Sequence, residues 1–335
     1  LGDITFSQPG DYVFYITEQQ GSAGGMTYDT TRHAVTVHVE DNLDGTLSVM
    51  ATEGANPTIT NVYQPTGEVE VQPVEGQFQL TKVLKGKAWD GDEFTFELTA
   101  KTGTAADGSL LRPEDGTIPM PEATTVTVGE KTGTNAEGND FATFGFGPIS
   151  YDAAGTYVYE VRELPGDNAG MDYDGRVATV TVKVTDNLQG GYAAAVQVEG
   201  SFTNIYATEV DYNAEGGLSI VKRLFGHDMT SEVPFEFTVT AEDEASAAKV
   251  GIDTTTLWKT LTTGDATMVS GVASTSLPVF DAAEFTQEDV GAIYRYTVSE
   301  TRGGDEALGY TNSDVVYTVE ITTADDGNGR LTVTT

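Results

Sequence analysis

The sequence predicts an all-β protein, built as tandem immunoglobulin-like β-sandwich modules with Greek-key connections. Residues 93–100, 177–184 and 317–322 alternate apolar and polar side chains and are rich in Val, Thr, Tyr and Phe, which is typical of strands with one buried face. Turns rich in Gly, Asp and Asn separate such segments. Short helical turns are predicted only near residues 242–250 and 286–290.

An internal repeat supports the modular organisation. Residues 4–18 and 149–163 both run from an Ile to a Glu with the same spacing, and a Gly precedes the alternating strand in each. A Met-X-Tyr-Asp motif, a turn that begins Asp-Asn-Leu and a Thr-Asn-X-Tyr end follow in the same order in both copies, at 26–29, 41–45 and 60–63 and at 171–174, 186–190 and 203–206. A more divergent third copy includes residues 285–300.

The repeat divides the chain into three modules. We expect residues 1–64 to be the C-terminal part of a first module, residues 77–207 a complete module, and residues 217–335 a module that lacks its last strand. Residues 65–76 and 208–216 contain Pro, Gly or Asn and read as linkers. Since the modules are out of phase with the chain ends, we expect a segment of a longer repeat protein.

Composition excludes several classes of partner. The 335 residues carry 52 acidic and 17 basic side chains, a net charge of −35, and no cysteine. Nucleic-acid binding needs a basic face, so we expect no nucleic-acid partner. An anionic membrane surface is disfavoured for the same reason, and no apolar run approaches the roughly 20 residues of a membrane span. Without cysteine, neither disulfides nor thiolate metal sites are possible.

A lysine recurs where a strand should point into its own core. Side chains alternate between the two faces of a strand, so Phe78, Leu80 and Leu84 place Lys82 on the inward side. The same pattern recurs around Lys222. A buried charge is costly unless it is paired, so these lysines need partners.

A glutamate and an asparagine follow the same inward pattern. Glu163 continues the apolar face of residues 157–163, and Glu18 and Glu300 end equivalent strands. Asn204 lies between Phe202 and Tyr206 on one face of its strand, and Asn61 occupies the matching place in the first copy. For each residue taken singly, a Lys–Glu ion pair or a solvent-reaching lysine is the alternative. The asparagine favours another interpretation, because a salt bridge needs no electrophile.

Lys, Glu and Asn in an apolar core can form a Lys–Asn isopeptide bond. Burial lowers the pKa of Lys82 and favours the nucleophilic amine, and it raises the pKa of Glu163. We expect protonated Glu163 to hydrogen-bond to the Asn204 carbonyl, polarise it and shuttle protons while ammonia leaves. The reaction occurs once per module without turnover, so we do not expect an enzyme, and it needs no cofactor or metal.

The chain resembles the isopeptide-linkage domains of Gram-positive pilins and repeat adhesins in residues 80–86 (LTKVLKG), 157–163 (YVYEVRE) and 202–206 (FTNIY). The resemblance implies a β-sandwich in which a Lys–Asn bond joins the first and last strands and a Glu acts as catalyst. By position, Lys82 and Asn204 are the bonded pair and Glu163 is the catalyst.

The other modules carry partial sets under the same resemblance. Lys222 and Glu300 match the last module, and Glu18 and Asn61 match the first. From the spacing in the middle module, 204 − 82 = 122 residues, the asparagine that would pair with Lys222 is expected near position 344. Only the middle module is therefore expected to close its bond within these residues.

The resemblance also implies a location and a partner. It implies an extracellular stalk or pilus, anchored to the cell wall of a Gram-positive bacterium, whose partners are neighbouring modules or subunits of the same fibre. The sequence contains no anchor or sorting signal. The alternative is an adhesin whose loops bind a host protein or glycan, and residues 102–139 form the long insertion that would do so.

Other chemistry has less support. The three histidines suggest no Ser-His-Asp set, since His33 and His38 belong to one strand region and His227 is remote. The turns at 41–44 and 325–328 contain carboxylates that could bind calcium, but hairpin turns use the same residues for backbone reasons. Trp89 and Trp258 could stack on sugars, although a packing role is more common.

Overall fold

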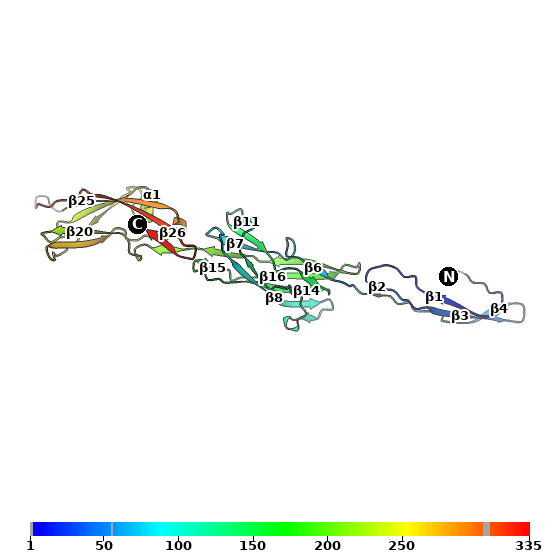
Figure 1. Cartoon of the computed structure of the whole chain (residues 1–335). Helices are drawn as coiled ribbons and strands as arrows, with labels where there is room; N and C mark the ends of the chain where they lie inside the picture. The colour runs from blue at the N-terminus through cyan, green and yellow to red at the C-terminus, as the bar shows by residue number, and fades with distance from the viewer. Residues whose placement is uncertain (1–2, 55, 304–308) are drawn as a thin grey trace.

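The computed structural model describes residues 3–54, 56–303 and 309–335. It shows an elongated all-β molecule in which three units follow one another in a row (Figure 1). The predicted fold class is confirmed. No helix among the described residues is long and apolar enough to cross a membrane.

The middle unit is a sandwich of two sheets. One sheet has the strand order β10-β8-β14-β16-β17, with β9 added to β8, and the other has the order β11-β12-β7-β18-β15. The first sheet comprises β8 (Phe94–Ala105), β9 (Leu110–Leu111), β10 (Thr125–Val128), β14 (Gly155–Leu164), β16 (Val177–Asp186) and β17 (Tyr192–Glu199). The second comprises β7 (Leu80–Lys85), β11 (Gly133–Thr134), β12 (Asp140–Phe144), β15 (Met171–Asp172) and β18 (Phe202–Tyr206).

One parallel pairing brings the two ends of the middle module together. Strand β18 pairs in parallel with β7, with Phe202 opposite Lys82 and Asn204 opposite Leu84, whereas the other pairings are antiparallel. Because residues two apart share a face, Lys82 and Asn204 are diagonal neighbours on the same inner face. Both side chains are fully buried.

The predicted linkers contribute strands to the modules. Strand β6 (Val69–Val71) lies within residues 65–76 and pairs with β13 (Ile149–Tyr151). Val71 is buried in the core of the middle module. Strand β19 (Glu209–Asp211), within residues 208–216, pairs with β24 (Glu284–Thr286) of the third module. Both segments therefore pack as module edges as well as connecting the modules.

The insertion at 102–139 is also part of the middle module rather than a free loop. It contains the end of β8, all of β9, β10 and β11, and the short helix η1 (Pro113–Asp115). Ile118 and Val128 are buried in the same core. The whole segment cannot be deleted as a free loop, because deletion would remove an edge strand and core side chains.

The described part of the first module consists of two small sheets. Strands β1 (Gly10–Ile16), β3 (His33–Asp41) and β4 (Leu47–Glu53) form an antiparallel sheet with β3 in the centre. Strand β2 (Met26–Thr27) pairs with β5 (Val62–Tyr63).

The third module has a five-stranded sheet of order β22-β21-β25-β26-β27 and the pairs β20-β23 and β19-β24. Its further elements are β20 (Ser219–Phe225), β21 (Phe235–Ala241), α1 (Glu244–Lys249), β22 (Trp258–Thr262), β23 (Val272–Pro278), η2 (Gln287–Asp289), β25 (Ile293–Gly303), β26 (Val316–Asp325) and β27 (Leu331–Thr334). Helices α1 and η2 confirm the two predicted helical turns. A groove between β20 and β25–β26 is lined by Lys222 and Glu300 among others.

Candidate functional site

Lys82, Glu163 and Asn204 meet in the interior of the middle sandwich. Lys82 Nζ lies 2.6 Å from Glu163 Oε2, and Asn204 Nδ2 donates to Glu163 Oε1 at 2.6 Å. Lysine and asparagine come from neighbouring strands β7 and β18 of one sheet, and the glutamate comes from β14 of the facing sheet. One carboxylate thus holds both partners of the predicted bond.

The site is dry and largely apolar. Lys82 and Asn204 are fully buried and Glu163 is 7% exposed. The Lys82 Nζ atom lies 4.6 Å from the ring centre of Phe94. Burial lowers the pKa of Lys82 to about 8 despite the attraction of Glu163, and burial raises the pKa of Glu163. Both shifts favour a neutral amine beside a neutral acid.

The amide of Asn204 is oriented by a backbone donor. Its Oδ1 atom accepts a hydrogen bond from the backbone N–H of Asp174 at 2.9 Å. A carbonyl oxygen accepts and an amide nitrogen donates, so this bond assigns Oδ1 to Asp174 and Nδ2 to Glu163. The expectation that Glu163 hydrogen-bonds to the Asn204 carbonyl is therefore wrong. Glu163 contacts the nitrogen that would leave, and Asp174 polarises the carbonyl.

Asp174 and Phe94 are residues of this site that the sequence analysis missed. The carboxylate of Asp174 accepts from the Thr203 backbone N–H at 2.6 Å and from Arg176, which fixes the loop beside Asn204. Its pKa is lowered to about 2 by these hydrogen bonds, against the effect of burial. The signal was present in the repeat, since Asp174 ends the Met-X-Tyr-Asp motif.

A match to a protein-family model identifies the family of this chain. All three modules match the FctA family, described as a Spy0128-like isopeptide containing domain, over residues 1–64, 78–207 and 218–335. The chain belongs to this family. Membership places the FctA chain among structural proteins of the extracellular cell surface. No curated protein showed significant similarity.

Among solved structures, the FctA chain is similar to major pilins of Streptococcus pyogenes. The T-13 pilin is 18% identical, with 80% of this chain and 94% of the pilin covered and a TM-score of 0.30. A second S. pyogenes major pilin is 17% identical, with coverage of 76% and 91% and a TM-score of 0.30. The T3.2 pilin is 15% identical, with coverage of 80% and 92% and a TM-score of 0.31.

The first FctA module reproduces the acid–amide half of the site. Asn61 Nδ2 donates to Glu18 Oε1 at 2.7 Å, and Asn61 Oδ1 accepts from the Asp29 backbone N–H at 2.9 Å. The second oxygen of Glu18, Oε2, is buried without a hydrogen-bond partner among the described residues. In the middle module the equivalent oxygen, Glu163 Oε2, binds Lys82.

The third FctA module reproduces the lysine–acid half. Lys222 Nζ lies 2.6 Å from Glu300 Oε1 and 4.1 Å from the ring centre of Phe235, as Lys82 does with Glu163 and Phe94. The other oxygen, Glu300 Oε2, accepts from the Ser313 backbone N–H at 3.1 Å. Within the part of the chain that the structure describes, all seven predicted residues have a place, but a complete triad comes together only in the middle module.

Of the weaker candidates, Trp89 and the turn aspartates make structural contacts in the FctA modules. Trp89 is buried and donates its indole N–H to the Asp92 carbonyl at 2.9 Å, whereas Trp258 is half exposed on β22. In the turns, Asp41 and Asp325 accept backbone N–H groups two residues on, as hairpin turns require. Among residues 3–54, 56–303 and 309–335 no group of three or more acidic, His or Cys side chains could hold a metal.

Proposed function

We propose that this chain is a structural segment of a cell-wall-anchored stalk or pilus of a Gram-positive bacterium, and that a Lys82–Asn204 isopeptide bond, formed with Glu163 as catalyst, closes its middle module, residues 77–207. The observation that carries the proposal is the buried contact of all three residues, with Glu163 between the other two. The 1–64 and 217–335 modules are further units of the same fibre, joined through residues 65–76 and 208–216.

The reaction balances without a cofactor. Glu163 takes a proton from Lys82 Nζ, and the free amine attacks Asn204 Cγ. The new Nζ–Cγ bond forms as the Cγ–Nδ2 bond breaks, and ammonia leaves with protons that Glu163 relays from Nζ to Nδ2. The overall change converts an ion pair and a primary amide into a secondary amide, ammonia and a protonated Glu163.

The surrounding groups support each step. The N–H of Asp174 points at the Asn204 oxygen on which negative charge develops, which is the role of an oxyanion-hole donor. The ring of Phe94 and the closed sandwich shield the lysine from solvent, which favours its reactive, neutral form. Strand pairing fixes the positions of Lys82 and Asn204, so the reaction does not carry the entropy cost of bringing two free groups together.

The adhesin alternative keeps part of its support. Ile118 and Val128 of the 102–139 segment pack into the core and Trp89 is buried, whereas residues 106–110 and 112–117 and Trp258 are exposed. Binding of a host protein or glycan remains a prediction without a defined surface. A bond that forms once and holds a module together suits a load-bearing fibre segment rather than an enzyme.

Intact-mass measurement of the recombinant chain tests the proposal. The mass should be lower than calculated by one ammonia, and a peptide map should contain a branched species that joins the Lys82 and Asn204 peptides. The matched control is Asn204→Ala, which should show its full calculated mass. Full mass and linear peptides in the parent chain would refute the proposed bond.

A further inference from the structure

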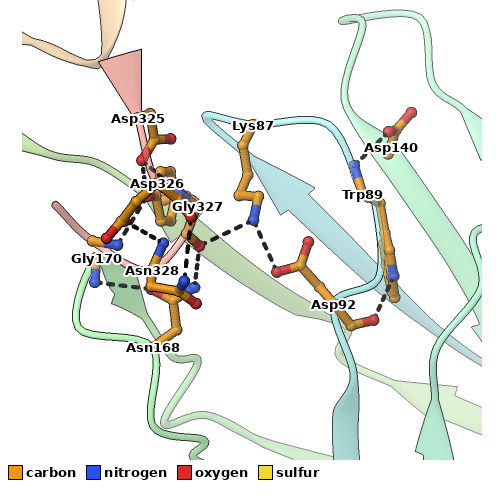
Figure 2. Close-up of polar contacts among 12 residues, drawn as sticks. Lys87, Trp89, Asp92, Asp140, Asn168, Gly170, Asp325, Asp326, Gly327 and Asn328 are labelled. Atoms are coloured by element: carbon orange, nitrogen blue, oxygen red, sulfur yellow. Dashed lines mark hydrogen bonds and ion pairs between the residues drawn. The ribbon is translucent and has the colours of Figure 1, made fainter. Parts of the chain in front are cut away.

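The middle and third modules meet at a joint built on one tyrosine. The Tyr206 hydroxyl donates to Asp325 Oδ1 at 2.7 Å and accepts from the Gly329 backbone N–H at 3.0 Å. Beside it, Asn168 Nδ2 donates to the carbonyl of Gly327 at 2.9 Å (Figure 2). Tyr206 ends the last strand of one module, and the residues it binds form the β26–β27 turn of the next.

The first and middle modules meet in the same way. The Tyr63 hydroxyl donates to Asp186 Oδ1 at 2.8 Å, and the Gly190 backbone N–H donates to it at 3.3 Å. Asp186 and Gly190 are the first and fifth residues of the β16–β17 turn. Asp325 and Gly329 hold the same two positions in the β26–β27 turn. The chain therefore uses one kind of joint twice.

Glycines on both sides make the joint selective. A Cβ atom on Gly170 would lie 2.7 Å from Gly329 Cα, and one on Gly25 would lie 2.8 Å from Gly190 Cα. These distances are shorter than any real contact of a Cβ atom, so a larger residue would separate the backbones. Each joint thus needs a tyrosine and a glycine on one module and an Asp…Gly turn on the next.

The first module carries a third copy of this turn, at residues 41–46. Its sequence, Asp-Asn-Leu-Asp-Gly-Thr, matches Asp-Asn-Leu-Gln-Gly-Gly of the β16–β17 turn at four of six positions. The backbone also matches: φ is 62° at Leu43 and 87° at Gly45, against 58° at Leu188 and 93° at Gly190.

The third turn is open in this structure. No atom of the described residues lies within 4 Å of a Cβ position on Gly45, and the Leu43 side chain is 92% exposed. Leu188 has the same left-handed backbone and is 80% exposed in the engaged β16–β17 turn, so the 41–46 turn already has the conformation that a joint uses. We propose that the 41–46 turn is a docking surface that receives the tyrosine and glycine end of another module of this repeat.

Charge favours that partner. The turn presents Asp41 and Asp44 at positions 1 and 4, and the Tyr206 end of the middle module carries Lys87, whose Nζ lies 3.4 Å from the Gly327 carbonyl across the existing joint (Figure 2). The proposal deepens the proposed stalk function, since the partner is a module of the same fibre. It does not depend on the isopeptide bond, which intact mass reports whether or not docking occurs.

The middle module provides a probe with a free tyrosine end. The members of its core cluster lie between Val71 and Tyr206, so residues 65–208 contain a complete sandwich that should fold alone. Asp186→Ala in this probe removes its own turn as a docking site. We would add the unlabelled probe to the ¹⁵N-labelled full chain, in which Tyr63 and Tyr206 are already engaged, and follow the amides of Leu43 and Gly45.

The expected result is a saturable shift of both amides. The matched control is the same probe with Tyr206→Phe, which loses one hydroxyl and should bind about tenfold more weakly, as for a hydrogen bond to a charged group. Asp41→Ala in the labelled chain should weaken binding similarly. Unchanged amides at millimolar probe, or shifts that Tyr206→Phe leaves intact, would overturn the proposal, because tethered modules experience effective concentrations in that range.

An exchange of turn sequences tests the same surface within the full chain. The double substitution Q189D/G191T gives the β16–β17 turn the sequence of residues 41–46. If the 41–46 sequence is competent, the existing joint at Tyr63 should survive, as measured by the distance between spin labels on the first and middle modules. A broadened distance distribution like that of Asp186→Ala would overturn the proposal.

Discussion

The side-chain amide of Asn204 contacts Glu163 through its nitrogen, at 2.6 Å, and not through its oxygen. The backbone N–H of Asp174 occupies the oxygen, which leaves only the nitrogen for the acid. Glu163 therefore contacts both the attacking nitrogen of Lys82 and the departing nitrogen of Asn204. A single carboxyl group can take the proton from the first and deliver it to the second.

Removal of the proton relay should stop bond formation without unfolding the module. Glu163→Gln keeps the shape and the contacts to β7 and β18 but cannot relay a proton, so we expect bond formation to slow by about 10²–10⁴-fold. Intact mass against time after folding measures this. Glu160→Gln, on the other face of β14 and paired with Lys101, is the matched control and should react at the parent rate. A parent-like rate in Glu163→Gln would remove Glu163 from the mechanism.

The rate of bond formation should depend on pH because only one protonation state of the Lys82–Glu163 pair is reactive. In that state the pair has lost one of the two protons that it binds when the ammonium and the carboxylic acid are both protonated. Below the raised pKa of Glu163, Lys82 stays an ammonium and cannot attack. Above the Lys82 pKa of about 8, the pair loses its last shared proton and Glu163 has none to give. Between these values the proton count is constant, so we expect a plateau that declines on both sides.

Refolding gives access to this profile. Chain purified under denaturing conditions from inclusion bodies starts the experiment unfolded and without the bond. It can be diluted into refolding buffers from pH 5 to 10, quenched at intervals and analysed by intact-mass spectrometry. A rate that continues to rise with pH above the Lys82 pKa would show that the free amine alone limits the reaction and that no acid is needed.

The bond should contribute strongly to stability. It would close a loop of 204 − 82 = 122 residues, and if closure entropy acts as for a disulfide, the gain is about 4–5 kcal/mol. Lys82→Met keeps most of the buried volume but cannot form the bond, so it should lower the melting temperature and admit protease. An unchanged melting temperature would contradict this. Asn204→Ala serves as a second bond-free variant with a different cavity.

One ammonia, rather than two or three, should be lost from these residues. Among residues 3–54, 56–303 and 309–335, only the middle module unites all three groups. Glu18 and Asn61 have no lysine beside them there, and Glu300 binds the Ser313 backbone where an asparagine would be needed. Limited proteolysis should leave a resistant core of about residues 69–207, because β6 pairs with β13 of this module, with more sensitive flanks. Two intramolecular crosslinks, or three equally resistant modules, would contradict the assignment.

The sequence by itself determined which side chains of each strand point inward, because apolar and polar residues alternate along the strands. Strand geometry repeats every two residues, so neighbouring apolar residues alone place Lys82, Glu163 and Asn204 on inward faces. The repeat identified the modules and the two partial sites for the same reason: each copy contains its own local pattern. These inferences need no knowledge of which strands pair.

Only the tertiary structure decided which groups meet and in what orientation. Lys82 reaches Glu163 across 81 residues of chain, and Asn204 is aligned by Asp174 from a loop on another part of the module. The same holds for Val71 and Val128, which the sequence placed in a linker and an insertion but which complete the core. Such contacts depend on strand order and sheet packing, and a local pattern carries no information about either.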